Sequence, residues 1–157
     1  MVAMGICRTL FAAGLFGLVA WSGTVAAKQC YAPDARSKER AFSRAVITEG
    51  GKTLWLGGQT APAKDASGKS LDGDFDAQVR AVFADLDKTL QANGGSLKDM
   101  VTMTVFINDV RLGDRFVEIR KEVFKECFPA SALITVTGFA RPGVMVEVQG
   151  IAVIGGK

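Results

Sequence analysis

The sequence predicts a single α+β domain in which two helices cover one face of a mixed β-sheet. Its 157 residues, 48% of them hydrophobic, are enough for one core. Apolar residues recur with a helical period in two segments and with a period of two in several others. The order of these segments is strand, strand, helix, strand, helix, strand, strand, which suits one sheet with its helices on one face.

The first 27 residues are typical of an export signal. They contain a single charged residue, an apolar run from Leu10 to Trp21, and the small residues Val25-Ala26-Ala27 that a signal peptidase needs. Cleavage there leaves a periplasmic or secreted chain that starts at Lys28 and has no membrane contact. The alternative is an anchor that stays uncleaved, because residues 9–27 carry no charge.

Export leaves two cysteines, Cys30 and Cys127, in an oxidising compartment. They form either a disulfide or two unlinked thiols with Cys127 in the core, because the sequence does not give the distance between their Cα atoms. No Cys-x-x-Cys pair is present, which argues against a zinc or thioredoxin-type site. We expect no metal and no cofactor.

The absence of histidine restricts the chemistry most. It removes the usual general base near neutral pH and every Ser-His or Cys-His dyad. Carboxylates, Lys, Arg, Cys or hydroxyl groups must therefore carry any reaction. The net charge is only +3 and the Lys and Arg residues are scattered among acids, so nucleic acid is not an expected partner.

The domain is predicted to follow a loose polar leader at residues 28–40 and to extend over residues 41–157. Strands at about 45–48 and 53–59, joined by a Gly-rich turn, predict a β-hairpin. The second strand ends in Gly57-Gly58, where missing side chains allow a ligand or another backbone to approach closely.

Two amphipathic helices follow. The first spans about residues 74–93, with acidic residues at its start and Gly94-Gly95 after its end. The second spans about residues 112–128 and ends at Pro129. The predicted apolar stripes are Phe75, Val79, Val82, Phe83, Leu86 and Leu90 in the first helix, and Leu112, Phe116, Ile119 and Val123 in the second.

Three further strands alternate apolar with small or polar side chains. The last strand places Glu147 and Gln149 on one face, about 7 Å apart. Because the strands carry apolar residues on both faces, we expect the sheet to associate with other subunits. The strands are predicted at residues 100–107, 128–136 and 144–153.

Short motifs between residues 41 and 153 match one known family in order and spacing. They are FSRAV from Phe42, LWLGGQ from Leu54, GGSLKDMV from Gly94, TVFIND from Thr104, FPA from Phe128 and VEVQGIAV from Val146. In this respect the chain resembles the RidA/YjgF family of enamine/imine deaminases.

The resemblance implies a chorismate-mutase-like α+β fold, a homotrimer, and three small-molecule clefts between subunits. In active deaminases of the family, an arginine after the Pro-Ala pair binds the carboxylate of a 2-imino acid as a bidentate ion pair. A glutamate near the C-terminus positions the hydrolytic water.

This sequence departs from that pattern at several site positions. Ser131 stands in place of the arginine, and Gln149 stands in place of the catalytic glutamate. A hydroxyl has no permanent charge, and an amide accepts no proton. Phe42 replaces a site tyrosine, and Arg120 replaces a site asparagine. The resemblance therefore predicts the fold and leaves the reaction open.

Two charged residues are candidates for the missing chemistry. Arg120 either restores a cation to the cleft beside Ser131 or belongs to a solvated helix face, and we favour the solvated face because charged helix faces are common. Glu147 is the only carboxylate on the last strand, so it is the candidate base; we favour a structural hydrogen bond or interface ion pair for it. The predicted ligand cleft consists of Phe42, Gly57, Gly58, Arg120, Ser131 and Gln149.

Three functions fit these observations. The first is a trimer that binds, or binds and hydrolyses, a small metabolite other than the usual imino acids, such as one without a carboxylate. The second is weak deamination of 2-imino acids or enamines. The third is a non-enzymatic trimer that binds proteins or acts like a chaperone.

Overall fold

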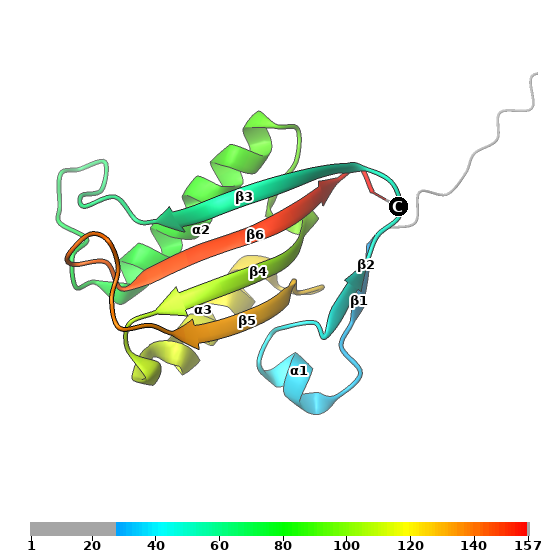
Figure 1. Cartoon of the computed structure of the whole chain (residues 1–157), viewed down its shortest axis with the longest axis horizontal. Helices are drawn as coiled ribbons and strands as arrows, with labels where there is room; N and C mark the ends of the chain where they lie inside the picture. The colour runs from blue at the N-terminus through cyan, green and yellow to red at the C-terminus, as the bar shows by residue number, and fades with distance from the viewer. Residues whose placement is uncertain (1–27, 157) are drawn as a thin grey trace, which may run out of the picture.

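The structure is a computed structural model that describes residues 28–156, so the predicted signal peptide lies outside the described residues. Its main sheet has four strands in the order β3-β6-β4-β5 (Figure 1). β3 and β4 run antiparallel to β6, and β5 runs parallel to β4. The strands are β3 (Lys52–Thr60), β4 (Met100–Ile107), β5 (Ala130–Thr135) and β6 (Val146–Ile154). The mixed sheet is therefore confirmed.

Both long helices lie on the same side of this sheet, α2 (Phe75–Ala92) beside α3 (Gly113–Phe124) (Figure 1). All six predicted stripe residues of α2 are buried in the core. The two helices meet through Phe83 and Phe116, whose ring centroids are 5.9 Å apart. Two 3₁₀ turns precede β4 and α3, at Leu97–Asp99 and Val110–Leu112.

The second helix ends earlier than predicted. It stops at Phe124 rather than at residue 128, because Lys125 has a φ of 62°, which side-chain-bearing residues rarely adopt. The chain then turns away from the helix axis and brings Cys127 to Cys30. Pro129 therefore lies five residues after the last residue of the helix, and it is not the residue that ends the helix.

The predicted hairpin is wrong, although both of its strands exist. β2 (Ala45–Ile47) pairs antiparallel with β1 (Gln29–Tyr31) in a separate two-stranded sheet. β3 instead pairs with β6, which is nine residues long, whereas β2 has only three residues to offer. The longer ladder satisfies more backbone groups and so determines the pairing.

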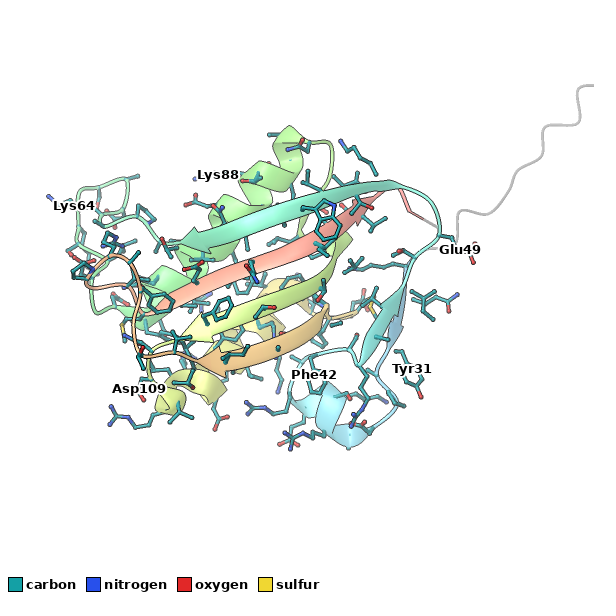
Figure 2. All side chains as sticks on the ribbon, in the orientation of Figure 1. Tyr31, Phe42, Glu49, Lys64, Lys88 and Asp109 are labelled. Atoms are coloured by element: carbon teal, nitrogen blue, oxygen red, sulfur yellow. A yellow bond between two sulfur atoms is a disulfide. The ribbon has the colours of Figure 1, made fainter. Side chains whose placement is uncertain are left out.

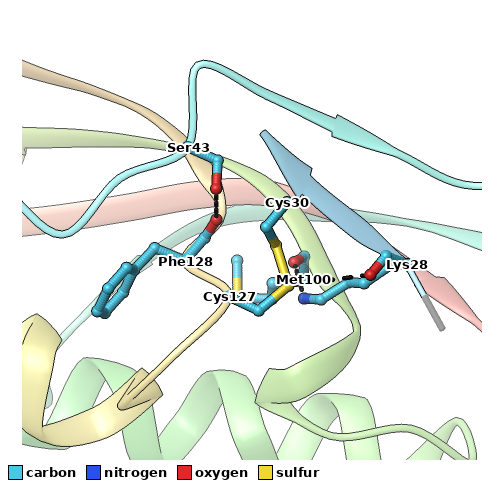
Figure 3. Close-up of a disulfide and its surroundings, with 6 residues drawn as sticks. All are labelled: Lys28, Cys30, Ser43, Met100, Cys127 and Phe128. Carbon is cyan, nitrogen blue, oxygen red and sulfur yellow. Dashed lines mark hydrogen bonds between the residues drawn. A yellow bond between two sulfur atoms is a disulfide. The ribbon is translucent and has the colours of Figure 1, made fainter. Parts of the chain in front are cut away.

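Residues 28–40 are not a loose leader. They contain β1 and the short helix α1 (Ala35–Glu39), whose first turn is capped by Asp34 through a 2.7 Å hydrogen bond from Ser37 N. The two cysteines form a disulfide with Cα atoms 5.3 Å apart (Figure 3). Beside it, Ser43 Oγ donates to the Phe128 carbonyl at 2.5 Å. These contacts tie the N-terminal segment to the start of β5.

No helix or strand of residues 28–156 covers the face of the main sheet opposite the two long helices (Figure 1). Two large apolar side chains are exposed there, Trp55 at 77% and Ile134 at 43%. Their neighbours along the strands point to the helix side, as the alternation of a strand requires. Within residues 28–156, no helix combines the length and apolar character needed to cross a membrane.

Candidate functional site

A small cavity of about 280 Å³ opens between α1, α3 and β5. Its lining has three arginines and no carboxylate, so we call it the basic cavity. Three of the predicted cleft residues line it: Phe42, which Figure 2 shows beside α1, Arg120 and Ser131. The full lining is Arg36, Arg40, Phe42, Val117, Arg120, Ser131 and Leu133.

Arg120 does not belong to a solvated helix face, so the prediction that its charge lies on the surface of α3 is wrong. The residue is only 3% exposed. Its Nη1 group donates to Ser131 Oγ at 2.7 Å, and its Nη2 group donates to the Arg40 carbonyl at 2.5 Å. Its guanidinium carbon lies 5.4 Å from the ring centroid of Phe116, one helical turn earlier. Arg120 thus extends the buried stripe of α3.

The guanidinium of Arg120 is a buried cation without a carboxylate partner in the described chain. Burial, together with the nearby charge of Arg40, lowers the pKa of Arg120 to about 10. Its Nε atom is buried and has no hydrogen-bond partner among residues 28–156. A buried charge is costly when no counter-charge accompanies it. The basic cavity is therefore suited to an anion, which would supply the missing charge.

Ser131 completes this arrangement from the edge strand. In β5 it is paired with Met103, which is buried under the helices, so the hydroxyl points to the helix side of the sheet. Its oxygen accepts the Arg120 hydrogen bond, which leaves the hydroxyl hydrogen available to a ligand. The serine alone carries no charge, but the pair offers a cation and a neutral donor side by side.

Two further residues at the rim of the cavity were not predicted as site residues, because they lie in the segment predicted to be a loose leader. Arg36 lies in α1 and Arg40 is the C-cap residue that follows it, and their spacing of four residues places both on one side of this short helix. Arg40 forms an ion pair with Asp114, whose side chain is 86% exposed. The signal that could have revealed α1 is Asp34 as an N-cap before a short run of helix formers.

The other predicted site residues lie on the opposite face of the sheet. Val146 and Val148 point into the core, so Glu147 and Gln149 point to the open face. A Cβ built on Gly58 would lie 1.9 Å from Glu147 Oε1, which shows that the carboxylate rests directly over this glycine. We call Gly57, Gly58, Glu147 and Gln149 the Glu147 patch.

A single chain therefore does not assemble the predicted cleft. The sheet separates the basic cavity, on its helix side, from the Glu147 patch, on its open side. Glu147 is paired with Phe106 in β4, whereas Ser131 is paired with the helix-side residue Met103. One site could use both regions only if a second copy placed its open face against the cavity of the first.

A larger hollow of about 570 Å³ lies elsewhere, beside the disulfide and the end of α3. Lys28 lines it and donates from Nζ to the Met100 carbonyl at 2.7 Å (Figure 3). Burial lowers the pKa of this lysine, and Asp99 opposes the shift. Among the predicted residues only Cys127 borders this hollow, and as part of the disulfide it offers no acid–base group.

Comparison with known sequences gives consistent matches. The family profile described as Endoribonuclease L-PSP matches residues 32–154. The chain is 30% identical to a RutC family protein of Pyrococcus horikoshii over 111 residues, which are 71% of this chain and 85% of the relative. It is 26% identical to the 2-iminobutanoate/2-iminopropanoate deaminase of Homo sapiens over 73% of this chain and 80% of that protein.

Solved structures agree with the sequence matches. RidA from the Antarctic bacterium Psychrobacter is 29% identical, with a TM-score of 0.59 over 72% of this chain and 88% of its own. A protein of the Rid family from Yersinia pestis, YyfB, gives a TM-score of 0.70 over 81% and 98% of the two chains. At 24% identity it bears on the fold alone. Together these structures confirm the predicted fold class.

Proposed function

The chain belongs to the Endoribonuclease L-PSP family, which includes the RidA/YjgF proteins, and on this premise we propose that it hydrolyses small 2-imino acids at clefts between the subunits of a homotrimer. The observation that carries the proposal is the hydrogen bond between Arg120 and Ser131 in the basic cavity. It supplies a guanidinium beside the position where the family resemblance leads us to expect one.

The basic cavity binds the carboxylate of the substrate. The hydroxyl of Ser131 donates to one carboxylate oxygen, and the positive charge of Arg120 behind it neutralises the anion. The cost of burying Arg120 is offset when the ligand arrives. This charge makes a ligand without a carboxylate the weaker alternative, because a neutral molecule would leave the buried cation uncompensated.

Glu147 of a neighbouring copy provides the acid–base chemistry. Its carboxylate takes a proton from water while the water oxygen attacks the imine carbon, which forms a tetrahedral carbinolamine. The same group returns this proton to the nitrogen, which becomes an amino group. It then takes the proton of the carbinolamine hydroxyl and delivers it to the amino group, so that the C–N bond breaks, ammonia leaves and the carbonyl of the 2-oxo acid forms. Gly58 has no side chain, which allows the Glu147 carboxylate to lie directly over its backbone.

The open sheet face supports the trimeric assembly. Trp55 and Ile134 are exposed on this face, and large apolar groups in such positions are common at subunit interfaces. A cyclic trimer would also bring each basic cavity to a Glu147 patch, which the single chain keeps apart.

We further propose that the protein is exported and that the mature chain begins at Lys28. The disulfide between Cys30 and Cys127 supports this, since such bonds persist in oxidising compartments. Native mass spectrometry of the protein, expressed with residues 1–27 in a host that can export it, measures the mass of the mature chain and of its assembly in one experiment. A chain that retains residues 1–27 would support the membrane anchor instead.

A complementation experiment tests the function. Arg120→Gln and Glu147→Gln each abolish the release of ammonia from imines generated by an amino-acid oxidase. The two inactive proteins are then unfolded together and refolded as mixed trimers. If each site takes Arg120 from one copy and Glu147 from the next, random mixing restores about a quarter of the wild-type rate.

The controls separate the outcomes. Lys121→Gln removes a neighbouring exposed charge from α3 and should leave the rate unchanged. If Arg120→Gln does not fold, Ser131→Ala takes its place in the mixed-trimer experiment. This variant removes the hydroxyl that donates a hydrogen bond to the ligand. No recovery in mixed trimers would refute the shared cleft. No turnover in the wild-type protein, with no ligand-induced rise in melting temperature, would favour a non-enzymatic trimer.

A further inference from the structure

The basic cavity carries more positive charge than one carboxylate requires. We propose that it selects a small dianion, the imine of an acidic amino acid, whose second carboxylate is bound by Arg36 and Arg40 at the rim. This inference rests on the proposed function and adds the class of substrate.

The first observation is the charge balance of the lining. Three arginines meet at a cavity of about 280 Å³, and the remaining lining residues are a serine and apolar groups. This volume lies slightly below the range typical of drug-sized ligands, so it suits a small metabolite. Arg120 and Ser131 satisfy one carboxylate. The two rim guanidinium groups are then left for a second one.

The second observation is that the rim arginines are weakly engaged. Among residues 28–156, Arg40 forms an ion pair only with Asp114. The Asp114 side chain is 86% exposed, and such exposed pairs contribute little to stability. Arg36 forms no ion pair with any carboxylate of residues 28–156. A ligand can therefore recruit both groups at low cost.

The third observation is that the rim is fixed in place. The Arg40 carbonyl accepts from Arg120 Nη2, so the backbone of the rim is bonded to the cation at the base of the cavity. α1 is capped by Asp34, and the disulfide and Ser43 tie its flanking segments to β5. A fixed pair of charges at one end of a small cavity discriminates ligands by length and charge, because the second anion must reach them.

The spacing of the charges favours a diacid over inorganic phosphate. Phosphate concentrates its charge on one centre and would satisfy Arg120 and Ser131 without reaching the rim. A five-carbon diacid carries its two carboxylates at opposite ends. Its first carboxylate lies at the base of the cavity and its second lies at the rim.

Two stable analogues of equal length test the inference by calorimetry. In 2-oxoglutarate and 2-oxopentanoate the imine is replaced by a carbonyl group, and the two differ only in the terminal carboxylate. We expect the wild-type protein to bind 2-oxoglutarate about tenfold more tightly, the effect of one added charge-assisted hydrogen bond. Arg36→Gln and Arg40→Gln should each remove most of this preference without changing the affinity for 2-oxopentanoate.

Lys38→Gln is the matched control. It removes one positive charge from the same helix, but residue 38 does not line the cavity, so the preference should survive. If Lys38→Gln lowers the preference for 2-oxoglutarate as much as Arg36→Gln does, the preference comes from the overall positive charge of the segment and not from the rim arginines. The inference is then overturned. Equal affinity for both analogues overturns it and leaves the proposed function standing. If the protein binds phosphate and neither analogue, both this inference and the proposed function are overturned. The same holds if it binds none of these ligands.

Discussion

The basic cavity and the Glu147 patch are positioned by different means. The cavity draws its lining from α1, α3 and β5, and these segments are joined by a disulfide, a helix cap and side-chain hydrogen bonds to carbonyl groups. The patch lies on β3 and β6, two neighbouring strands with a continuous ladder apart from one bulge. Substitutions that remove the disulfide, the helix cap or these hydrogen bonds should therefore affect the cavity. Substitutions that add or remove atoms beside Glu147 should affect the patch.

Removal of the disulfide should give the largest difference between the two regions. The cysteines are 97 residues apart, and closing a loop of this length adds about 4.7 kcal/mol to the unfolding free energy in the chain-entropy model. We expect Cys30→Ala/Cys127→Ala to lower the stability by about this amount in denaturant titrations. Amides of β1 and α1 should also lose hydrogen-exchange protection through local opening.

Protection along β6 serves as the internal reference in that experiment. Its exchange should follow the global stability alone, because no cysteine lies on or beside its ladder. If β1, α1 and β6 lose the same protection, the cavity is not the separately tied region that its contacts indicate. Reduction of the wild-type protein should reproduce the result for the double variant.

The same division explains what the sequence could predict. The stripe of α2 and the alternation of β4 follow from local periodicity, and both were found. Arg120 shows what local periodicity does not predict. It lies one turn after Phe116 on the buried stripe of α3, but a charged side chain is expected on the exposed face of a helix. Its partners, Ser131 and the Arg40 carbonyl, are 11 and 80 residues away, so only the folded chain reveals them. The disulfide and the pairing of β2 with β1 depend on such distant contacts too.

A methyl group at Gly58 should disturb the patch while leaving the cavity intact. The new Cβ would lie 1.9 Å from Glu147 Oε1, so the carboxylate must move. Because it is the end of a flexible side chain, we expect a stability loss of no more than about 1 kcal/mol. A displacement of this size should nevertheless lower imine hydrolysis at least about tenfold.

Gly57→Ala is the matched control for this variant. A Cβ at Gly57 meets no atom of the described part of the chain within 4 Å, so Glu147 should stay in place. Binding of 2-oxopentanoate should be unchanged in both variants, because we propose that its carboxylate binds in the basic cavity and not at the Glu147 patch. If Gly58→Ala hydrolyses imines at the wild-type rate, Glu147 is not the group that activates water.

Acid should loosen the cavity before the patch, and this is the smallest of the expected effects. Hydrogen bonds from Ser37 N, Arg44 and Ser37 Oγ lower the pKa of Asp34 to about 2. A carboxyl group with a lowered pKa adds stability that is fully present above its unfolded pKa, near 3.8, and is lost as the pH falls towards 2.

Hydrogen exchange between pH 4.5 and 2 measures this effect, after correction for the intrinsic rate. We expect α1 to lose protection relative to β6 as Asp34 is protonated, since the uncharged group accepts the cap hydrogen bond less well. Asp34→Asn keeps a side-chain acceptor at the cap but does not titrate, so its α1 should show no such pH dependence. If the wild-type protein and Asp34→Asn lose the same protection in acid, other carboxylates cause the loss. Asp34 is then not one of the residues that hold α1 in place at the rim of the cavity.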